Sequence, residues 1–234
     1  MYGKYNYPCI IEEGSISIEV IEEDGLLIYR RVCGDDTLEL ILSSPDAELI
    51  INPVEPVNLP KNITHFLEIE FDKVLMAPES EYDFYVTYPI EIGVFLKLGK
   101  NISILDIFSQ VKSKYSIYGS PKAGVVVKWH KSKLYKKMPE IDIFREGLMS
   151  LKILNPEREV VEVSKAVFDS YGMKIFYNDW YVTMSAEMKV MLKGEAETRF
   201  ISVPVVEGTD RTIDLYHGRD IPVVGKFYKM KWGY

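Results

Sequence analysis

The sequence predicts a mainly β protein with two β-sandwich-like domains and one short helix near their junction. Two observations predict this class. Apolar residues recur with a period of two along most of the 234 residues, and turn residues separate the alternating runs. Charge also divides the chain, because residues 1–117 hold 20 acidic and 9 basic residues, whereas residues 118–234 hold 15 and 19. We therefore expect an acidic β-rich domain at 1–117, which ends in the short helix, and a mildly basic β-rich domain at 118–234.

The predicted elements follow in chain order. A first hairpin is centred on Asp24-Gly25, where an Asp-Gly pair favours a tight turn between two alternating strands. A stretch with three prolines at 53–60 predicts an extended connection. A helix is predicted at 102–115 from Ile104, Ile107, Phe108 and Val111, with Ser103 as its N-cap. After it the period of two returns, and the clearest hairpin turns near Gly194.

Composition bounds the class of protein. No apolar run reaches the roughly 18 residues of a membrane span, and the first residues lack the pattern of a secretory signal. We expect a cytoplasmic protein. Lys and Glu are abundant and Gln110 is the only glutamine, which is typical of heat-adapted proteins. Cys9 and Cys33 are expected to be small buried residues, with a disulfide between them as the alternative.

No motif of a known catalytic site is present. Gly119 and Gly124 have the spacing of a phosphate-binding loop, but Val125 and Val126 follow where lysine and a hydroxyl residue are needed. Good metal ligands are few and scattered, because there are two cysteines and three histidines. We expect no bound metal and no cofactor.

His217 is the histidine with the most chemistry around it. Asp214 and Asp220 lie three residues to either side, and a carboxylate beside a histidine is how general bases are oriented. The same composition is typical of a surface turn. His65 is expected in or near the core, and His130 is expected at the surface.

Two groups of carboxylates are candidates of different kinds. Glu91 is the only charged residue in the apolar run 85–96, so it is expected to be covered and either paired structurally or functional. Glu68, Glu70 and Asp72 share one face of a predicted strand. They are expected to form a solvated face, with a hard-cation site as the alternative.

The most basic stretch, residues 122–137, contains six lysines and no acidic residue. On a strand, Lys128 points one way with His130, while Trp129, Lys131 and Lys133 point the other way. The stretch suits contacts with phosphates, and Trp129 suits stacking on bases. Because the whole chain is acidic, we expect an exposed edge strand protected by lysines, with nucleic acid not the partner.

Three segments, 55–71, 85–95 and 114–126, together resemble the archaeal domain-of-unknown-function family four-hundred-thirty-two. The likeness extends along most of the chain. It implies no catalytic residue, because the family has no established activity. It keeps a membrane-associated partner among the expectations, since members occur near mechanosensitive-channel genes.

Two functions follow from these observations. The first is a non-enzymatic β-rich binding or accessory protein that acts through a protein or polyanionic partner, with homo-oligomers allowed. The alternative is a hydrolase or metal-dependent enzyme that uses His217 with Asp214 and Asp220, joined by Glu91.

Overall fold

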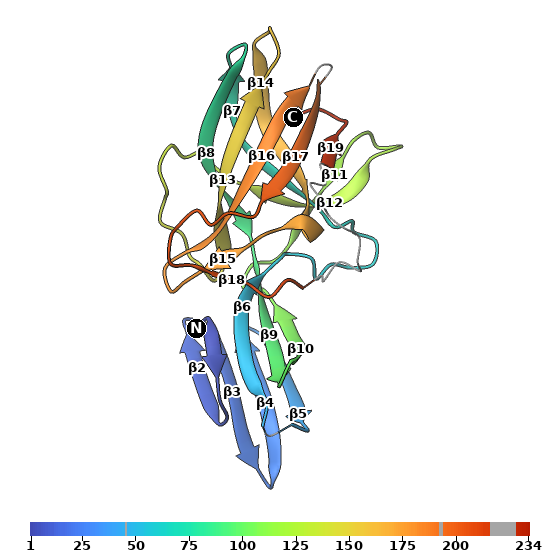
Figure 1. Cartoon of the computed structure of the whole chain (residues 1–234). Coiled ribbons are helices and arrows are strands. Elements are labelled where there is room, and N and C mark those ends of the chain that lie inside the picture. Colours follow the sequence, from blue (N-terminus) through green and yellow to red (C-terminus); the bar gives the residue numbers. More distant parts are fainter. Residues whose placement is uncertain (45, 192–193, 216–227) are drawn as a thin grey trace. The chain divides into compact units, whose positions relative to one another are not determined.

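The protein is mainly β, as predicted. The computed structural model describes residues 1–44, 46–191, 194–215 and 228–234. These residues contain strands, connections and one 3-10 turn at Ser170–Gly172, and no α-helix is found among them (Figure 1). Within the same ranges, no helix has the length and hydropathy needed to cross a membrane.

The chain forms two compact units that are interleaved in sequence. Unit 1 contains Met1–Pro53 and Glu91–Gln110, and unit 2 contains Val54–Ile90 and Val111–Tyr234. This division differs from the predicted one at 117/118, because residues 54–90 pack with the second half of the chain. The period of two marks strands but does not reveal which distant strands pair.

Unit 1 contains two four-stranded sheets, and their strands are coloured blue to green in Figure 1. One sheet has the order β2-β3-β4-β5 and the other β1-β6-β9-β10. The strands of the first sheet are β2 (Cys9–Glu13), β3 (Ile16–Glu23), β4 (Leu26–Cys33) and β5 (Asp36–Leu42). Those of the second are β1 (Gly3–Tyr5), β6 (Glu48–Val54), β9 (Glu91–Leu98) and β10 (Asn101–Phe108).

The first hairpin forms as predicted, with Asp24 and Gly25 at φ 52° and 78° between β3 and β4. Both values lie in the left-handed region that Asp-Gly turns favour. Cys9 and Cys33 are free thiols, and only Cys33 is fully buried.

The helix predicted at 102–115 is wrong. Residues 101–108 form strand β10, which pairs antiparallel with β9, and Lys114–Tyr118 form strand β11. A bulge between Ile104 and Asp106 shifts the register, so that Ile104 pairs with Phe95 and Asp106 with Val94. The bulge moves the following side chains to the opposite face. It therefore produces an irregular apolar spacing that resembles a helical period.

Unit 2 also contains two sheets. The first has the order β11-β12-β7-β14 and the second β18-β15-β16-β13-β8, with β17 beside β16 and β19 beside β17. The first sheet comprises β11, β12 (Val125–Lys131), β7 (Phe66–Met76) and β14 (Val161–Asp169). The second comprises β8 (Ser80–Pro89), β13 (Glu146–Asn155), β15 (Phe176–Tyr177), β16 (Val182–Met191), β17 (Glu195–Ile201), β18 (Asp210–Arg211) and β19 (Tyr228–Met230).

Tyr88 occupies the core of unit 2 at the end of β8. Its ring lies over Gly147, its partner on β13, where any Cβ would overlap the ring. Burial, followed by the carboxylate of Glu55, raises the pKa of Tyr88 well above its usual value. The Tyr88 hydroxyl and the Glu55 carboxyl therefore interact electrostatically at this end of the second sheet.

Candidate functional site

The predicted lysine strand is not an edge strand. Strand β12 pairs antiparallel with β11 on one side and parallel with β7 on the other, so the edge-strand prediction is wrong. The pairing with β7 joins residues about sixty positions apart in sequence, and periodicity cannot detect such a contact. Lys128 is buried at 3% exposure, and its Nζ lies 3.4 Å from the carbonyl oxygen of Pro56. It is not available to a partner in solution.

Four exposed lysines of the basic stretch lie where β12 ends. We call residues 131–137 the lysine segment; within it Lys131, Lys133, Lys136 and Lys137 are exposed. Within the part of the chain that the structure describes, none of these four makes an ion pair. The segment thus presents four uncompensated positive charges to solvent.

Backbone contacts fix the lysine segment against the second unit's sheets. Tyr135 exchanges two backbone hydrogen bonds with Tyr85 of β8, at 2.8 and 2.9 Å. The N–H of Ser132 donates to the carbonyl of Glu70, and its hydroxyl accepts from the N–H of Thr87 at 2.8 Å. The segment therefore has a defined path along β8 rather than that of a free loop.

Trp129 is held on the face opposite to Lys128. Its indole N–H donates to the Glu70 carboxylate at 3.2 Å, and the Lys114 ammonium lies 5.8 Å from the ring centroid. Half-buried and hydrogen-bonded in this way, the ring is not presented as a free surface for base stacking.

His130 is largely covered, contrary to the prediction that it is exposed. Its side chain is 19% exposed, and Nε2 lies 2.8 Å from the Thr87 hydroxyl and 3.8 Å from the Glu146 carboxylate. Burial, followed by the charges of Lys114 and Lys128, lowers the pKa of His130 to about 4. His130 is therefore neutral at pH 7, and it has the environment of a core histidine.

His65 lies in a partly exposed position at the start of β7. Its Nε2 is 3.4 Å from the Asp169 carboxylate, and its ring stacks on Tyr171 with centroids 4.2 Å apart. These contacts agree with the semi-core position predicted for it.

The cluster predicted around His217 is described only in part. His217 and Asp220 lie outside the described residues. Asp214 accepts two hydrogen bonds from Arg211, at 2.7 and 3.0 Å, and lies 3.6 Å from Lys174 Nζ. Asp214 is thus a paired carboxylate at the edge of the second unit's larger sheet.

A buried carboxyl beside Asp214 was not predicted. Glu55 is 2% exposed, and its Oε2 accepts from the N–H of Leu215 at 3.1 Å. Burial raises the pKa of Glu55 to about 7, assisted by Asp214 and opposed by backbone N–H donors and Lys174. Glu55 is the only charged residue in 49–60, so the reasoning that singled out Glu91 would have found it.

Replacing Glu55 by Gln is expected to remove a pH dependence of stability. Between pH 4.5 and about 7 the folded chain retains a proton that the unfolded chain releases. Wild-type stability therefore falls as pH rises through this window, by up to about 3 kcal/mol, and is level above it. The amide cannot ionise but can still accept from Leu215. Urea unfolding of both proteins across this range should show the advantage of the variant growing with pH.

The exposed Glu12 provides the control. Glu12→Gln is expected to follow the wild-type profile at every pH. Parallel profiles for wild type and Glu55→Gln would contradict the assignment of this pH dependence to Glu55.

Glu91 begins strand β9 in unit 1 and is 3% exposed. Its predicted burial is confirmed. Ile92, Val94 and Phe95, which follow it on β9, are also buried. The Glu91 carboxylate therefore lies among core residues.

The carboxylates of β7 do not form one solvated row as predicted. Glu68 is buried, accepts from the Ser116 hydroxyl at 3.0 Å and lies 3.7 Å from Lys165 Nζ. Asp72 is exposed, and Glu70 is held by Trp129. Among the described residues, no three side chains of the metal-ligating types are grouped closely enough to hold a metal ion.

Taken together, these observations define an all-β protein with two compact units, several buried carboxyl groups and a fixed, exposed lysine segment. The chain belongs to the family described as "Protein of unknown function (DUF432)", which matches residues 1–232. No curated protein and no solved structure shows a significant match.

Proposed function

We propose that the protein is a non-enzymatic binding or accessory protein that acts through a protein or polyanionic partner. The lysine segment is its contact. The observation that carries this proposal is the set of four exposed lysines that make no ion pair with any residue the structure describes. The proposal includes a cytoplasmic location in a heat-adapted archaeal cell, which is supported by the Lys- and Glu-rich composition.

The anchoring of the segment supports a role in binding. Hydrogen bonds from Ser132 and Tyr135 fix the backbone before any partner arrives. A preordered contact loses less conformational entropy on association than a free loop. Acidic protein surfaces are favoured over nucleic acid, because the Trp129 indole is already hydrogen-bonded to Glu70 and is not free to stack on bases.

The alternative is a hydrolase or metal-dependent enzyme centred on Asp214, His217 and Asp220. It is supported by the buried Glu55, whose raised pKa suits a proton-transfer group near neutral pH. Elemental analysis is its first test. About one zinc or iron per purified chain would favour this alternative, and a metal-free protein would favour the binding function.

Reversing the lysine segment is expected to abolish binding to an acidic polymer. The probe is immobilised poly-L-glutamate, on which wild-type protein should be retained at about 0.05 M salt and released near physiological ionic strength. Changing Lys131, Lys133, Lys136 and Lys137 to Glu should abolish retention, because the contact charge becomes repulsive. Duplex DNA should not bind wild type at physiological salt.

The matched control reverses four scattered lysines. Lys4, Lys61, Lys100 and Lys112 are exposed, and their change to Glu alters the net charge by the same amount. This variant should keep most of the wild-type retention. Equal loss in both variants would mean that net charge, rather than the segment, governs binding.

A further inference from the structure

The sheet β2-β3-β4-β5 of unit 1 has one buried face. It includes the side chains of Ile16, Ile18, Val20 and Tyr29. Because side chains alternate along each strand, the residues between these project from the opposite side. We call that side the outer face. The register of the four strands assigns to it Ile10, Glu12, Ser17, Glu19, Ile21, Glu23, Leu26, Ile28, Arg30, Val32, Thr37, Glu39 and Ile41.

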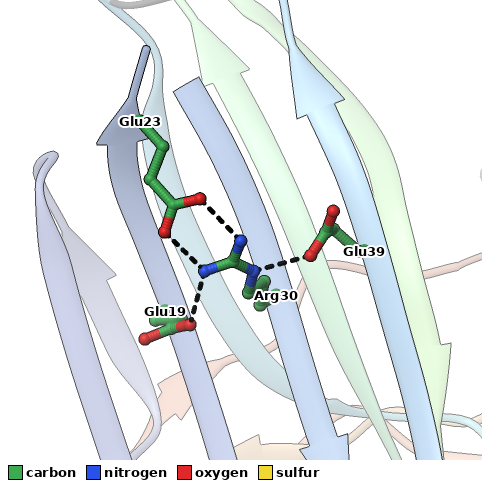
Figure 2. Close-up of polar contacts among 4 residues, drawn as sticks. All are labelled: Glu19, Glu23, Arg30 and Glu39. Atoms are coloured by element: carbon green, nitrogen blue, oxygen red, sulfur yellow. Dashed lines mark hydrogen bonds and ion pairs between the residues drawn. The ribbon is translucent and has the colours of Figure 1, made fainter. Parts of the chain in front are cut away.

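Acidic residues dominate the charges of the outer face. Arg30, in the middle of the face, is bound by Glu23 at 2.7 Å and by Glu39 at 2.6 Å, with Glu19 at 3.6 Å (Figure 2). With Glu12 added, the face carries four glutamates and one arginine, a net charge of −3. Arg30 therefore compensates only one of the four negative charges on the outer face.

Large aliphatic side chains lie exposed among these carboxylates. Ile10 and Ile41 are 66% and 67% exposed, and Leu26 and Val32 are 47% and 42% exposed. Single exposed aliphatics are ordinary, but these four lie on the same side of one sheet, from β2 to β5, beside its carboxylates. The face therefore suits a partner that is both basic and partly apolar.

The charges of the two units complement each other. Unit 1 contains 13 acidic and 5 basic residues, a net charge of −8, and unit 2 contains 22 and 23, a net charge of +1. The lysine segment places four exposed lysines of unit 2 close together in sequence, and Leu134 and Tyr135 between them are half-buried. The lysine segment therefore carries the positive charge that would neutralise the glutamates of the outer face.

We propose that the outer face of one copy of this chain docks the lysine segment of a second copy. This contact would bring the four exposed lysines, which lack an ion pair in the described part of the chain, against the carboxylates and exposed aliphatics of the outer face. The inference rests on the proposed function, since it names the partner of the same segment.

Charge reversal tests the docking through self-association of the full chain. Sedimentation velocity should show wild type as a dimer or larger species at about 0.05 M salt and as a monomer at about 1 M salt. The segment variant changes Lys133 and Lys136 to Glu, and the face variant changes Glu12 and Glu39 to Lys. Each alone should weaken self-association by at least about tenfold, because opposed charges become like charges.

Mixing the two variants gives the decisive result. In the mixture, the unaltered face of one variant meets the unaltered segment of the other, so association should return to near the wild-type level. Return of association also shows that both variants are folded. A control that changes Lys61 and Lys112 to Glu should associate like wild type.

Three results would overturn the docking: a monomeric wild type at low salt, a mixture that remains monomeric, or a control that dissociates as far as the segment variant. Retention on poly-L-glutamate separates this inference from the proposed function. A monomer that is retained there refutes only the self-association, whereas loss of both refutes the function of the segment as well.

Discussion

Asp106→Ala is expected to lower the free energy of unfolding of unit 1 by about 3–5 kcal/mol. Asp106 lies on β10 with its side chain 7% exposed, and its Oδ2 accepts from Arg31 Nε at 2.9 Å and from the Tyr29 hydroxyl at 3.0 Å. Tyr29 and Arg31 come from the other sheet of the same unit, so the carboxylate joins the two sheets. Its removal leaves a guanidinium, 5% exposed at the side chain, without its buried counter-charge.

Asp36 provides a control at the same arginine. It lies closer to Arg31, with Oδ2 2.6 Å from Nη1, but its side chain is 67% exposed. Water replaces an exposed carboxylate at little cost, so Asp36→Ala should change stability by only about 0–1 kcal/mol. If distance decided the energy, Asp36→Ala would be the more harmful variant.

Urea unfolding of the three proteins, followed by circular dichroism, measures these differences. A third variant, Arg31→Met with Asp106→Leu, removes both charges and should recover most of the loss, because apolar pairs often replace buried ion pairs without cost. Equal destabilisation by Asp36→Ala and Asp106→Ala would contradict the role assigned to burial.

The sequence correctly predicted those parts of the fold that depend only on residues close together in the chain. The hairpin at Asp24-Gly25 needs only a left-handed turn and two alternating strands, and both are visible locally. The burial of Glu91 followed from its apolar neighbours in the same way. Local pattern is sufficient where a single strand or turn decides the outcome.

The predictions that were wrong depend on contacts between distant residues. The bulge at Ile104/Asp106 is set by pairing with β9, and it gave the sequence a false helical period. Strand β12 was predicted at an edge, because its parallel pairing with Glu68 and Ile69 of β7 leaves no mark on its own pattern. Of the basic stretch, the lysine segment, which starts at the last residue of β12, therefore remains the candidate surface.

Glu91→Ala is expected to destabilise unit 1 by about 3–5 kcal/mol. The carboxylate is 3% exposed at the start of β9. A carboxylate this deeply buried is retained only where charged or N–H groups satisfy it, and truncation leaves those groups without a partner. Glu48 on β6 of the same sheet is the control, because its ion pair with Lys97 is partly exposed. Glu48→Ala should cost only about 0–1 kcal/mol.

Glu91→Gln separates a structural from a functional role for this residue. The amide keeps the shape of the side chain and loses the charge. If the carboxylate serves only the fold, Glu91→Gln should unfold at lower urea than wild type and should still self-associate in sedimentation velocity. If unit 1 retains this buried charge because its docking face needs it, the variant should be at least as stable as wild type and should lose self-association, since functional residues often cost stability. A wild-type unfolding midpoint for both Glu91→Ala and Glu91→Gln, with self-association intact, would refute both roles.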